Sequence, residues 1–370
     1  MNIGILSMQK VPNYGSFLQA LALKKELEKL SLGGDVYFID IEEGTHIIPP
    51  GPKDKGPEKL FKKLDRYALK RIENLFFSMY MEKIHKQDYT TYLQTDKKLP
   101  ESEKFDLVVI GSDEVFNAGI SSKWGFSPQL FGNVKRAKRV ITYAASCGQT
   151  TKSVTDQYGM TSAIREALER VRSISVRDQG TYELVYGITG RKAYKHVDPV
   201  FLADFNPYIP TLPKRKPYLL LYAYVNRIND EGEIRAIREF AMKYGLEILS
   251  VGTQQRWCKN NKTACAFELL AYVKGAAYIV TDTFHGSVFS IKYNKPFAAF
   301  IRESNKNKLG ELLRFFGLMD RALHSADELE AVLQTKVDYN AINVKIDEEK
   351  QRAELYLQNA IKAATGAAEA

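Results

Sequence analysis

The chain alternates short apolar runs with helix-patterned stretches, and it does so twice, on either side of a proline-rich segment. It opens with an apolar run at 2–7, a helical pattern at 16–30 and a second apolar run at 36–41. Strands that alternate with helices form parallel sheets, because each helix returns the chain to the same edge of the sheet. The pattern therefore predicts a doubly wound α/β fold.

The alternation divides the chain into two domains. The strand-like runs LVVIGS, RVITYAAS, SISVR and YKHVD complete the first domain, which we expect over residues 1–205. Four of the 13 prolines fall within 206–217, a composition that keeps a linker extended. The second domain is expected over 218–335, with the strand-like runs YLLLYAYV, LEILSVG, YIVTD and PFAAFI and with helices near 231–244 and 266–275. The remaining 336–370 form a tail, predicted to be helical from about 346 to 364, that either caps its own domain or crosses back to the first.

A basic stretch at about residues 50–95 is inserted in the first domain. Its apolar residues share one helical face, and lysines and arginines crowd the other. The apolar face consists of Leu60, Leu64, Tyr67, Ala68, Ile72, Leu75, Phe76 and Met79. Two interpretations stay open: a helix that packs on the first domain, or an acceptor-side surface that contacts anionic lipid or a lipid-linked diphosphate.

The charge balance narrows the class of partner. The chain carries 53 basic and 44 acidic side chains, a net charge of +9, which favours an anionic partner. Nucleic acid is not expected, because the sequence has no RNP motif, zinc-ligand spacing or basic helix followed by heptads. Three cysteines without a signal peptide fit a reducing compartment, so the expected location is cytoplasmic. No window approaches about 20 apolar residues, so no membrane-spanning segment is predicted.

The segments that follow the first domain's strands are the candidate sites, because open α/β sheets bind ligands at the carboxyl ends of their strands. NYGSFLQA is either an ordinary helix start or an anion-binding helix N-terminus. In GSDEVFN, Asp113 is a helix cap, a base for a sugar hydroxyl, or both. In AASCGQT, Cys147 is a thiol nucleophile or, since nothing adjacent would lower its pKa, more simply a small buried residue.

Two further strand ends carry charged or titratable groups. In SISVRDQG, Arg177 either grips a phosphate or carboxylate with two hydrogen bonds or pairs with Asp178 at the surface. In VTDTFHGSVFS, His285 follows an apolar strand, with Gly286 and Ser287 placed to start a helix. Imidazole suits proton transfer near neutral pH, so this histidine is a candidate acid or base.

Taken in order, NYGSFLQALAL, GSDEVFN, YAASCG, SVRDQG, HVDPVFL, TDTFHGSVFS and KPF resemble the polysaccharide pyruvyl transferase family. The resemblance covers most of residues 1–320. It implies a GT-B-like pair of Rossmann-type domains that face each other across a cleft. The implied donor is phosphoenolpyruvate, and the acceptor is a hydroxyl pair of a sugar in a surface polysaccharide or its undecaprenyl-diphosphate-linked precursor. No metal or other cofactor is expected.

The resemblance and the chemistry of ketal formation together suggest site residues. The expected catalytic residues are His285, Asp113 and Asp282. The expected donor-binding residues are Arg177, His285, Gly286, Ser287, Thr283, Arg302 and Lys308. The expected acceptor-binding residues are Asn13, Tyr14, Gly15, Ser112, Asp113, Asn117 and Ser146. Thr283 stands where family members often carry an arginine, so that contact must come from elsewhere, with Arg302, Lys306 and Lys308 as candidates.

Two other functions remain open at this stage. A GT-B glycosyltransferase with a nucleotide-sugar donor would share the architecture, because a fold does not determine a reaction. A non-enzymatic binding protein of a polysaccharide assembly system is the second alternative. A Rossmann dehydrogenase is disfavoured, because the loop after the first strand reads SMQKVPNYGS and contains no GxGxxG. With a lipid-linked acceptor, peripheral contact with the cytoplasmic face of the inner membrane is also expected.

Overall fold

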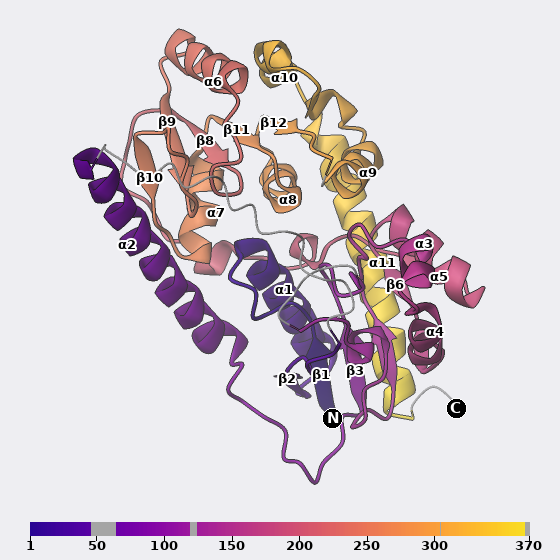
Figure 1. The fold of residues 1–370 in the computed structure, drawn as a ribbon. Coiled ribbons are helices and arrows are strands. Elements are labelled where there is room, and N and C mark those ends of the chain that lie inside the picture. Colours follow the sequence, from indigo (N-terminus) through magenta and orange to yellow (C-terminus); the bar gives the residue numbers. More distant parts are fainter. Residues whose placement is uncertain (46–63, 119–123, 304, 367–370) are drawn as a thin grey trace. The chain divides into compact units, whose positions relative to one another are not determined.

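A computed structural model describes residues 1–45, 64–118, 124–303 and 305–366 (Figure 1). The chain forms two compact units. The first unit comprises Met1–Pro12, Lys24–Asp198 and Leu355–Ala370, and the second comprises Asn13–Leu23 and Pro199–Glu354. These units differ from the expected domain ranges, because the start of the first long helix and most of the C-terminal tail belong to the second unit.

The first unit contains a five-stranded parallel sheet with strand order β2-β1-β3-β4-β5. Its strands are β1 (Asn2–Leu6), β2 (Asp35–Phe38), β3 (Leu107–Ile110), β4 (Val140–Thr142) and β5 (Val171–Ser173). A short parallel pair, β6 (Ser175–Val176) and β7 (Tyr194–Lys195), continues from it through single bridges at Ala145. The sheet order reverses between β1 and β3, which places the predicted ligand-binding edge at the ends of these two strands.

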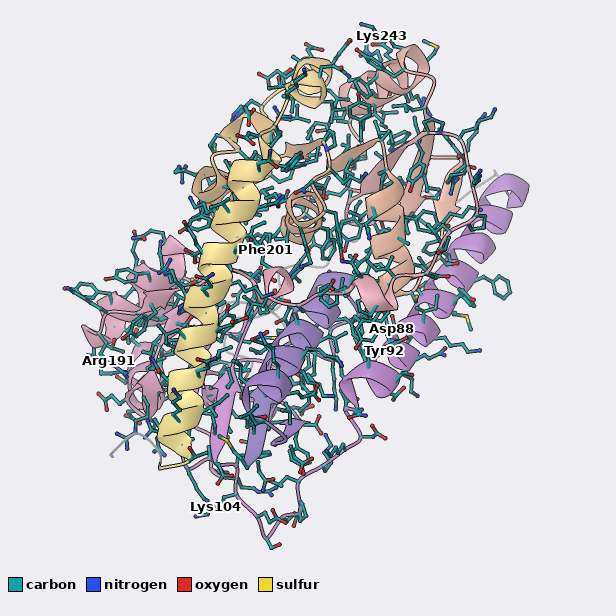
Figure 2. The ribbon with its side chains drawn as sticks, turned by 180° about the vertical axis from the view of Figure 1, so that it is seen from behind. Asp88, Tyr92, Lys104, Arg191, Phe201 and Lys243 are labelled. Carbon is teal, nitrogen blue, oxygen red and sulfur yellow. The ribbon has the colours of Figure 1, made fainter. Side chains whose placement is uncertain are left out.

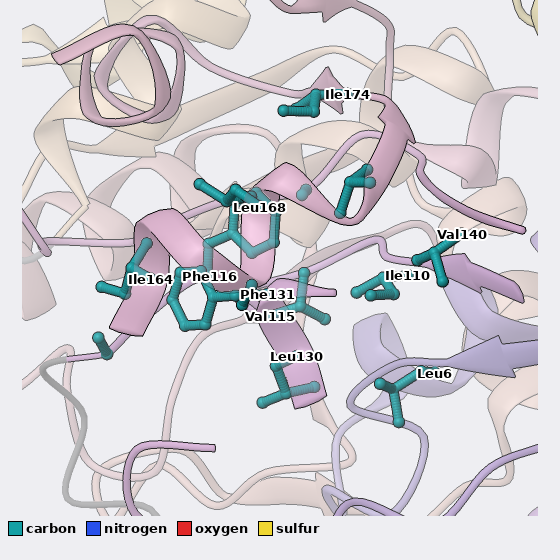
Figure 3. Packing of buried hydrophobic residues seen from close by; sticks show 14 of the residues in the cluster. Leu6, Ile110, Val115, Phe116, Leu130, Phe131, Val140, Ile164, Leu168 and Ile174 are labelled. Atoms are coloured by element: carbon teal, nitrogen blue, oxygen red, sulfur yellow. The ribbon is translucent and has the colours of Figure 1, made fainter. Parts of the chain in front are cut away.

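The first unit also contains the first five α-helices of the described chain. They are α1 (Tyr14–Leu30), shared with the second unit, and α2 (Leu64–Asp88), α3 (Lys152–Gln157), α4 (Thr161–Glu169) and α5 (Gln179–Thr189). Of these, α4 and α5 contact strands of the unit's sheets. Leu6, Ile110 and Val140 from the strands and Ile164 and Leu168 from α4 belong to one buried cluster (Figure 3). Strands β1, β3 and β4 are buried on both faces, as expected for a doubly wound sheet.

The second unit contains a six-stranded parallel sheet with order β10-β9-β8-β11-β12-β13. Its strands are β8 (Tyr218–Tyr222), β9 (Glu247–Val251), β10 (Asn260–Lys262), β11 (Tyr278–Thr281), β12 (Phe297–Phe300) and β13 (Ala322–Leu323). Counted within the unit, this is the 3-2-1-4-5-6 order of a Rossmann fold. The order reverses between β8 and β11, so the ends of these two strands form the second predicted binding edge.

The helices of the second unit agree closely with the sequence pattern. They are α6 (Glu231–Lys243), α7 (Ala266–Gly275), α8 (Phe284–Lys292), α9 (Lys306–Phe316), α10 (Leu329–Gln334) and α11 (Tyr339–Ala364). Helix α11 extends further back than the tail helix predicted at about 346–364, and from Leu355 onward it belongs to the first unit. There the Tyr356 hydroxyl donates a hydrogen bond to the Thr142 carbonyl. The tail is therefore part of both units.

The described end of the inserted stretch does not pack through the apolar face that the first of its two interpretations requires. Its helix is α2, which ends at Asp88 (Figure 2), and residues 46–63 lie outside the described part of the chain. Phe76 and Met79, expected on the shared apolar face, are 66% and 58% exposed, while Met81 and His85 are buried. The end of α2 therefore packs through a different face, and the two expected apolar residues lie on its exposed side.

Candidate functional site

In the first unit, a cluster of charged side chains gathers at the ends of β3, β6 and β7. Arg177 follows β6, and its Nη1 lies 2.6 Å from Asp198 Oδ2 while its Nη2 lies 3.9 Å from Asp113 Oδ1. Both Arg177 and Asp198 are almost entirely buried. Burial alone would lower the pKa of Arg177, but Asp198, Asp113 and Asp178 together raise it. Arg177 thus pairs with Asp198 inside the unit, and Asp178 is itself buried rather than part of a surface pair.

Asp178 makes hydrogen bonds that hold the local structure of this cluster. Its carboxylate caps α5 by accepting from the Thr181 backbone N-H at 2.8 Å, and it also accepts from the Ser146 hydroxyl at 2.6 Å. Ser112 and Ser146 are both fully buried, and the Ser112 hydroxyl donates a hydrogen bond to the Ala144 carbonyl at 3.1 Å. These two serines, expected at the acceptor, therefore hold the sheet edge together.

Asp113 is the most accessible carboxylate of the cluster. It has a left-handed backbone (φ +70°), which directs it out of the line of the strand, and its side chain is 15% exposed. It caps no helix in the described residues, so the helix-cap interpretation is not supported. Asn117, four residues further on, donates to Glu114 at 2.7 Å and accepts from Thr150 at 2.9 Å.

Cys147 follows β4, and its side chain is buried. Burial, together with the nearby charge of Asp178, raises the pKa of its thiol to about 12. Such a thiol stays protonated at neutral pH, which favours the interpretation of Cys147 as a small buried residue.

In the second unit, His285 lies at the first turn of α8, directly after β11. The helix begins at Phe284, earlier than the expected start at Gly286, because Thr283 caps it by accepting from the Gly286 N-H at 2.9 Å. Gly286 is required at its position, since a Cβ there would lie 2.1 Å from Thr281 Oγ1. His285 is 9% exposed, and its ring contacts the rings of Phe284 and Phe289. Ser287 is fully buried.

The start of α1 packs directly on this histidine. A Cβ built on Gly15 would lie 2.0 Å from His285 Nδ1, so only glycine allows the observed approach. Asn13 caps the helix by accepting from the Gly15 N-H at 2.7 Å. Tyr14 is buried in the same unit and donates to the Ala264 carbonyl at 2.6 Å. The structure thus brings Gly15, which we expected at the acceptor, against the expected acid.

Asp282 directly follows β11, and its carboxylate is fully buried. Its Oδ1 accepts from the Tyr224 N-H at 3.2 Å, and its Oδ2 lies 2.9 Å from Arg227 Nε. Burial raises its pKa, although Arg227 acts in the opposite direction. Arg227 was not among the predicted site residues, because it follows β8 and no motif marks it.

The expected substitutes for the missing arginine have other roles or positions. Arg302 binds Glu233 through two hydrogen bonds of 2.6 and 2.8 Å, and Lys306 pairs with Glu303 at 2.7 Å. Lys308 lies on α9. Asn305 joins this region to the site by donating to the Asp282 carbonyl at 2.7 Å.

A cavity of about 600 Å³ lies elsewhere in the second unit, beneath the proline-rich segment. Its lining includes Pro213, Arg215, Tyr218 and Lys274. Tyr218 begins β8, so the cavity lies at the amino ends of the strands, where open α/β sheets do not usually bind their ligands. Among the described residues, no group of three or more histidine, cysteine, aspartate or glutamate side chains is placed to hold a metal ion.

Two Rossmann-type parallel sheets, each with a polar cluster at the edge where its strand order reverses, define a GT-B-like α/β protein. The sequence profile of the polysaccharide pyruvyl transferase family matches residues 13–304. The chain therefore belongs to the polysaccharide pyruvyl transferase family, as the motifs predicted.

Comparisons with solved structures concern the fold. A candidate UDP-N-acetylglucosamine 2-epimerase from Listeria monocytogenes is 10% identical, with a TM-score of 0.55, over 99% of this chain and 96% of that one. Arabidopsis thaliana UGT89C1 complexed with UDP is 9% identical, with a TM-score of 0.48, over 97% and 99%. The glycosyltransferase SnogD from Streptomyces nogalater is 12% identical, with a TM-score of 0.47, over 98% and 99%. No curated protein sequence matches the chain significantly.

Proposed function

We propose that the protein transfers pyruvate from phosphoenolpyruvate to two hydroxyls of one sugar, forming a ketal and releasing phosphate. Family membership and the placement of His285 at the reversal point of the second sheet support this proposal. The acceptor belongs to a surface polysaccharide or to its undecaprenyl-diphosphate-linked precursor. The reaction requires no metal, and the net charge of +9 suits a donor with about three negative charges.

The proposed reaction begins when an acid protonates the methylene carbon of phosphoenolpyruvate, which turns it into a methyl group. The resulting oxocarbenium-like carbon is attacked by one sugar hydroxyl, whose proton passes to a base. A second hydroxyl of the same sugar then forms the other C-O bond as the bond to phosphate breaks, and its proton leaves with the phosphate. A well-placed acid or base accelerates such steps by roughly 10²- to 10⁴-fold.

We assign the acid role to His285, because Gly15 and the rings of Phe284 and Phe289 fix the orientation of its imidazole. Of the two carboxylates, Asp113 is the better base, since its side chain is 15% exposed whereas Asp282 is fully buried. Asp282 is therefore a positioning residue. Arg177 keeps its role as a donor-binding group, with Asp198 orienting its guanidinium.

The experiment that tests this function is incubation with phosphoenolpyruvate and a panel of galactose-, mannose- and N-acetylmannosamine-containing acceptors. Product mass and released phosphate are measured together. We expect a pyruvate ketal and one phosphate for each product. Release of a nucleoside diphosphate from a nucleotide sugar would instead identify a glycosyltransferase. If phosphoenolpyruvate is not consumed and does not raise the melting temperature, the binding-protein alternative is favoured.

The exposed side of α2 supports a second element of the proposal, peripheral contact with an anionic membrane. Phe76, Met79 and Tyr80 are 66%, 58% and 54% exposed, and the exposed Lys83 and Lys86 follow on the same side of the helix. Exposed aromatic and apolar groups beside lysines are typical of helices that lie in the interface of an anionic bilayer. No helix among the described residues has the length and hydropathy needed to cross a bilayer.

Vesicle flotation tests this contact. The native chain should float with vesicles that contain phosphatidylglycerol and not with neutral vesicles, and the double variant Phe76→Ser/Tyr80→Ser should lose most of this binding. Met242→Ser is the control, because Met242 is an exposed apolar residue (79%) on α6, away from α2 in the sequence. Equal flotation of all three proteins would refute a role for this face of α2.

A further inference from the structure

The cavity beneath the proline-rich segment lies at the amino ends of β8 and β11. Tyr218 begins β8, and Ala277 directly precedes β11. His285 follows the other end of β11, and the four residues of this strand separate its two ends by about 13 Å, at roughly 3.3 Å per residue. Every residue that lines the cavity belongs to the second unit. The cavity is therefore separate from the edge that carries His285.

The charged lining of this cavity is basic. Arg215, Lys216 and Lys274 line it, and no described aspartate or glutamate does. Lys274 donates to the neutral Asn206 Oδ1 at 2.7 Å, and no ion pair joins it to a carboxylate among the described residues. Burial, and then the charge of Lys274, lowers the pKa of Lys295. The cavity thus holds positive charge that no acid of its own lining offsets.

Arg215 is held in place while part of its guanidinium has no acceptor. Its Nη2 donates to Glu247 Oε2 at 2.7 Å, and the guanidinium lies 5.0 Å from the centre of the Tyr218 ring. Its Nε is buried and has no acceptor among the described residues. The Tyr218 hydroxyl in turn donates to the Tyr272 carbonyl at 2.7 Å. Tyr218 thus links Arg215 to the last turn of α7, which carries Lys274.

Most of the remaining lining is aliphatic. It includes Ile209, Leu212 and Ala271 together with prolines of the segment above. The volume of about 600 Å³ equals the liquid volume of about twenty waters, and protein pockets of this size bind small organic molecules. Aliphatic walls gain free energy when they cover an apolar group in place of water. The cavity therefore fits an anion that carries an apolar body.

We propose that this cavity binds an organic anion with an aliphatic chain, whose charged head contacts Arg215 and Lys274 and whose chain lies against Ile209 and Leu212. A prenyl phosphate and a fatty carboxylate share this chemistry, and the test separates them. The site goes beyond the proposed pyruvate transfer, since it lies at the opposite end of β11 from His285. Because the proline-rich segment forms one wall, a bound ligand joins this segment to the sheet and should raise the melting temperature.

Lys274 also has a structural role that the test must separate from ligand binding. A cation in the last turn of a helix is stabilised by the helix dipole, and α7 ends one residue after Lys274. That role affects the free energy of unfolding and does not depend on the charge of a ligand. The decisive measurement is therefore the difference in affinity between a charged ligand and its neutral counterpart.

Isothermal titration calorimetry measures the binding of farnesyl monophosphate, farnesol, myristate and inorganic phosphate, each below its aggregation concentration. We expect one farnesyl monophosphate per chain. Farnesol and inorganic phosphate should each bind at least roughly 10-fold more weakly, because each lacks one half of the contact. Tighter binding of farnesyl monophosphate than of myristate would identify a prenyl phosphate as the ligand, and the reverse order would identify a fatty acid.

The variants test the residues that carry the proposal. Lys274→Met and Arg215→Gln should each weaken farnesyl monophosphate binding roughly 10- to 100-fold and leave the weaker binding of farnesol unchanged, as expected for lost charge-assisted hydrogen bonds. Lys274→Arg keeps the charge and should retain most of the affinity. Leu212→Ser should weaken both ligands alike, because it removes part of the apolar wall. Lys262→Met is the matched control, since Lys262 is an exposed lysine at the carboxyl end of β10 in the same sheet.

Melting temperatures without ligand separate a folding defect from lost binding. If Lys274→Met does not fold, Arg215→Gln decides in its place, because the Arg215 side chain is 24% exposed. The inference is wrong if neither amphipathic anion binds, if farnesol binds as tightly as farnesyl monophosphate, or if Lys262→Met loses as much affinity as Lys274→Met. Inorganic phosphate that binds as tightly as the ester would also refute it. No measurement here involves phosphoenolpyruvate, so the site and the proposed transfer stand or fall separately.

Discussion

Replacing Gly15 by alanine should inactivate the enzyme although the substitution adds a single methyl group. The new Cβ would lie 2.0 Å from His285 Nδ1 and 2.2 Å from its Cγ, whereas an ordinary contact needs at least 3.4 Å. The ring must therefore move by about 1.4 Å, the difference between 3.4 and 2.0 Å. Rotation of the ring about the Cβ–Cγ bond cannot relieve the clash, because Cγ lies on that bond and does not move.

The magnitude follows from what surrounds the ring. His285 is 9% exposed and contacts the rings of Phe284 and Phe289, so a displaced imidazole has little free space around it. Overpacking of this kind costs about 1–3 kcal/mol. A displacement of about 1 Å at a reacting group costs roughly 10²-fold in rate. Helix propensity acts in the opposite direction, since alanine in place of glycine favours a helix by about 1 kcal/mol.

The assay uses Gly310→Ala as control, because Gly310 lies within α9 and a Cβ there meets nothing within 4 Å. We expect Gly310→Ala to raise the melting temperature slightly and leave turnover intact, while Gly15→Ala lowers both turnover and melting temperature. In a His285→Ala background the destabilising effect of Gly15→Ala should vanish, which a double-mutant cycle measures without any activity. A Gly15→Ala variant that is as active and as stabilised as Gly310→Ala would refute the reasoning.

Three other predictions concern single residues. His285→Ala should fold normally and lose about 10²- to 10⁴-fold in turnover with saturating phosphoenolpyruvate, and near-native turnover would remove it from the mechanism. Asp198→Asn should destabilise the first unit by about 3–5 kcal/mol because it strands the buried Arg177, whereas Asp35→Asn in the exposed pair with Lys97 should have no measurable effect in urea unfolding. Burial lowers the pKa of His85 to about 4, so the unfolded chain binds the extra proton first as the pH falls. Stability should therefore be complete above about pH 6.5 and fall by about 3 kcal/mol toward pH 4, and His85→Gln should abolish that part of the pH dependence.

Much of the fold could be predicted because both sheets are parallel and buried, so their strands are continuous apolar runs. The helix predicted near 266–275 and the one near 231–244 match α7 and α6 almost residue for residue. Strands β10 and β13 were not predicted, since they are short and lie at the edges of their sheet. The start of α8 was placed too late, because the capping hydroxyl of Thr283 was not recognised.

The site was harder to predict than the fold. Asp113 and His285 stand out because each directly follows an apolar run. Arg227 does not, since its proximity to Asp282 arises from the neighbouring positions of β8 and β11 in the sheet. The contact between Gly15 and His285 joins segments far apart in the sequence, and no local pattern indicates it. Ser112 and Ser146 looked like ligand contacts because small polar residues at strand ends have the same signature whether they bind a ligand or a carbonyl.

The division of α1 and α11 between the two compact units limits how such proteins can recombine. The second unit begins at Asn13, leaves the chain after Leu23, resumes at Pro199 and ends at Glu354. Exchanging it intact between two relatives would need four crossovers, two of them inside continuous helices. A single crossover near the proline-rich segment would join the His285 of one parent to the Gly15 of the other. Gene shuffling within this fold should therefore yield active chimaeras only when the start of α1 is inherited together with α8.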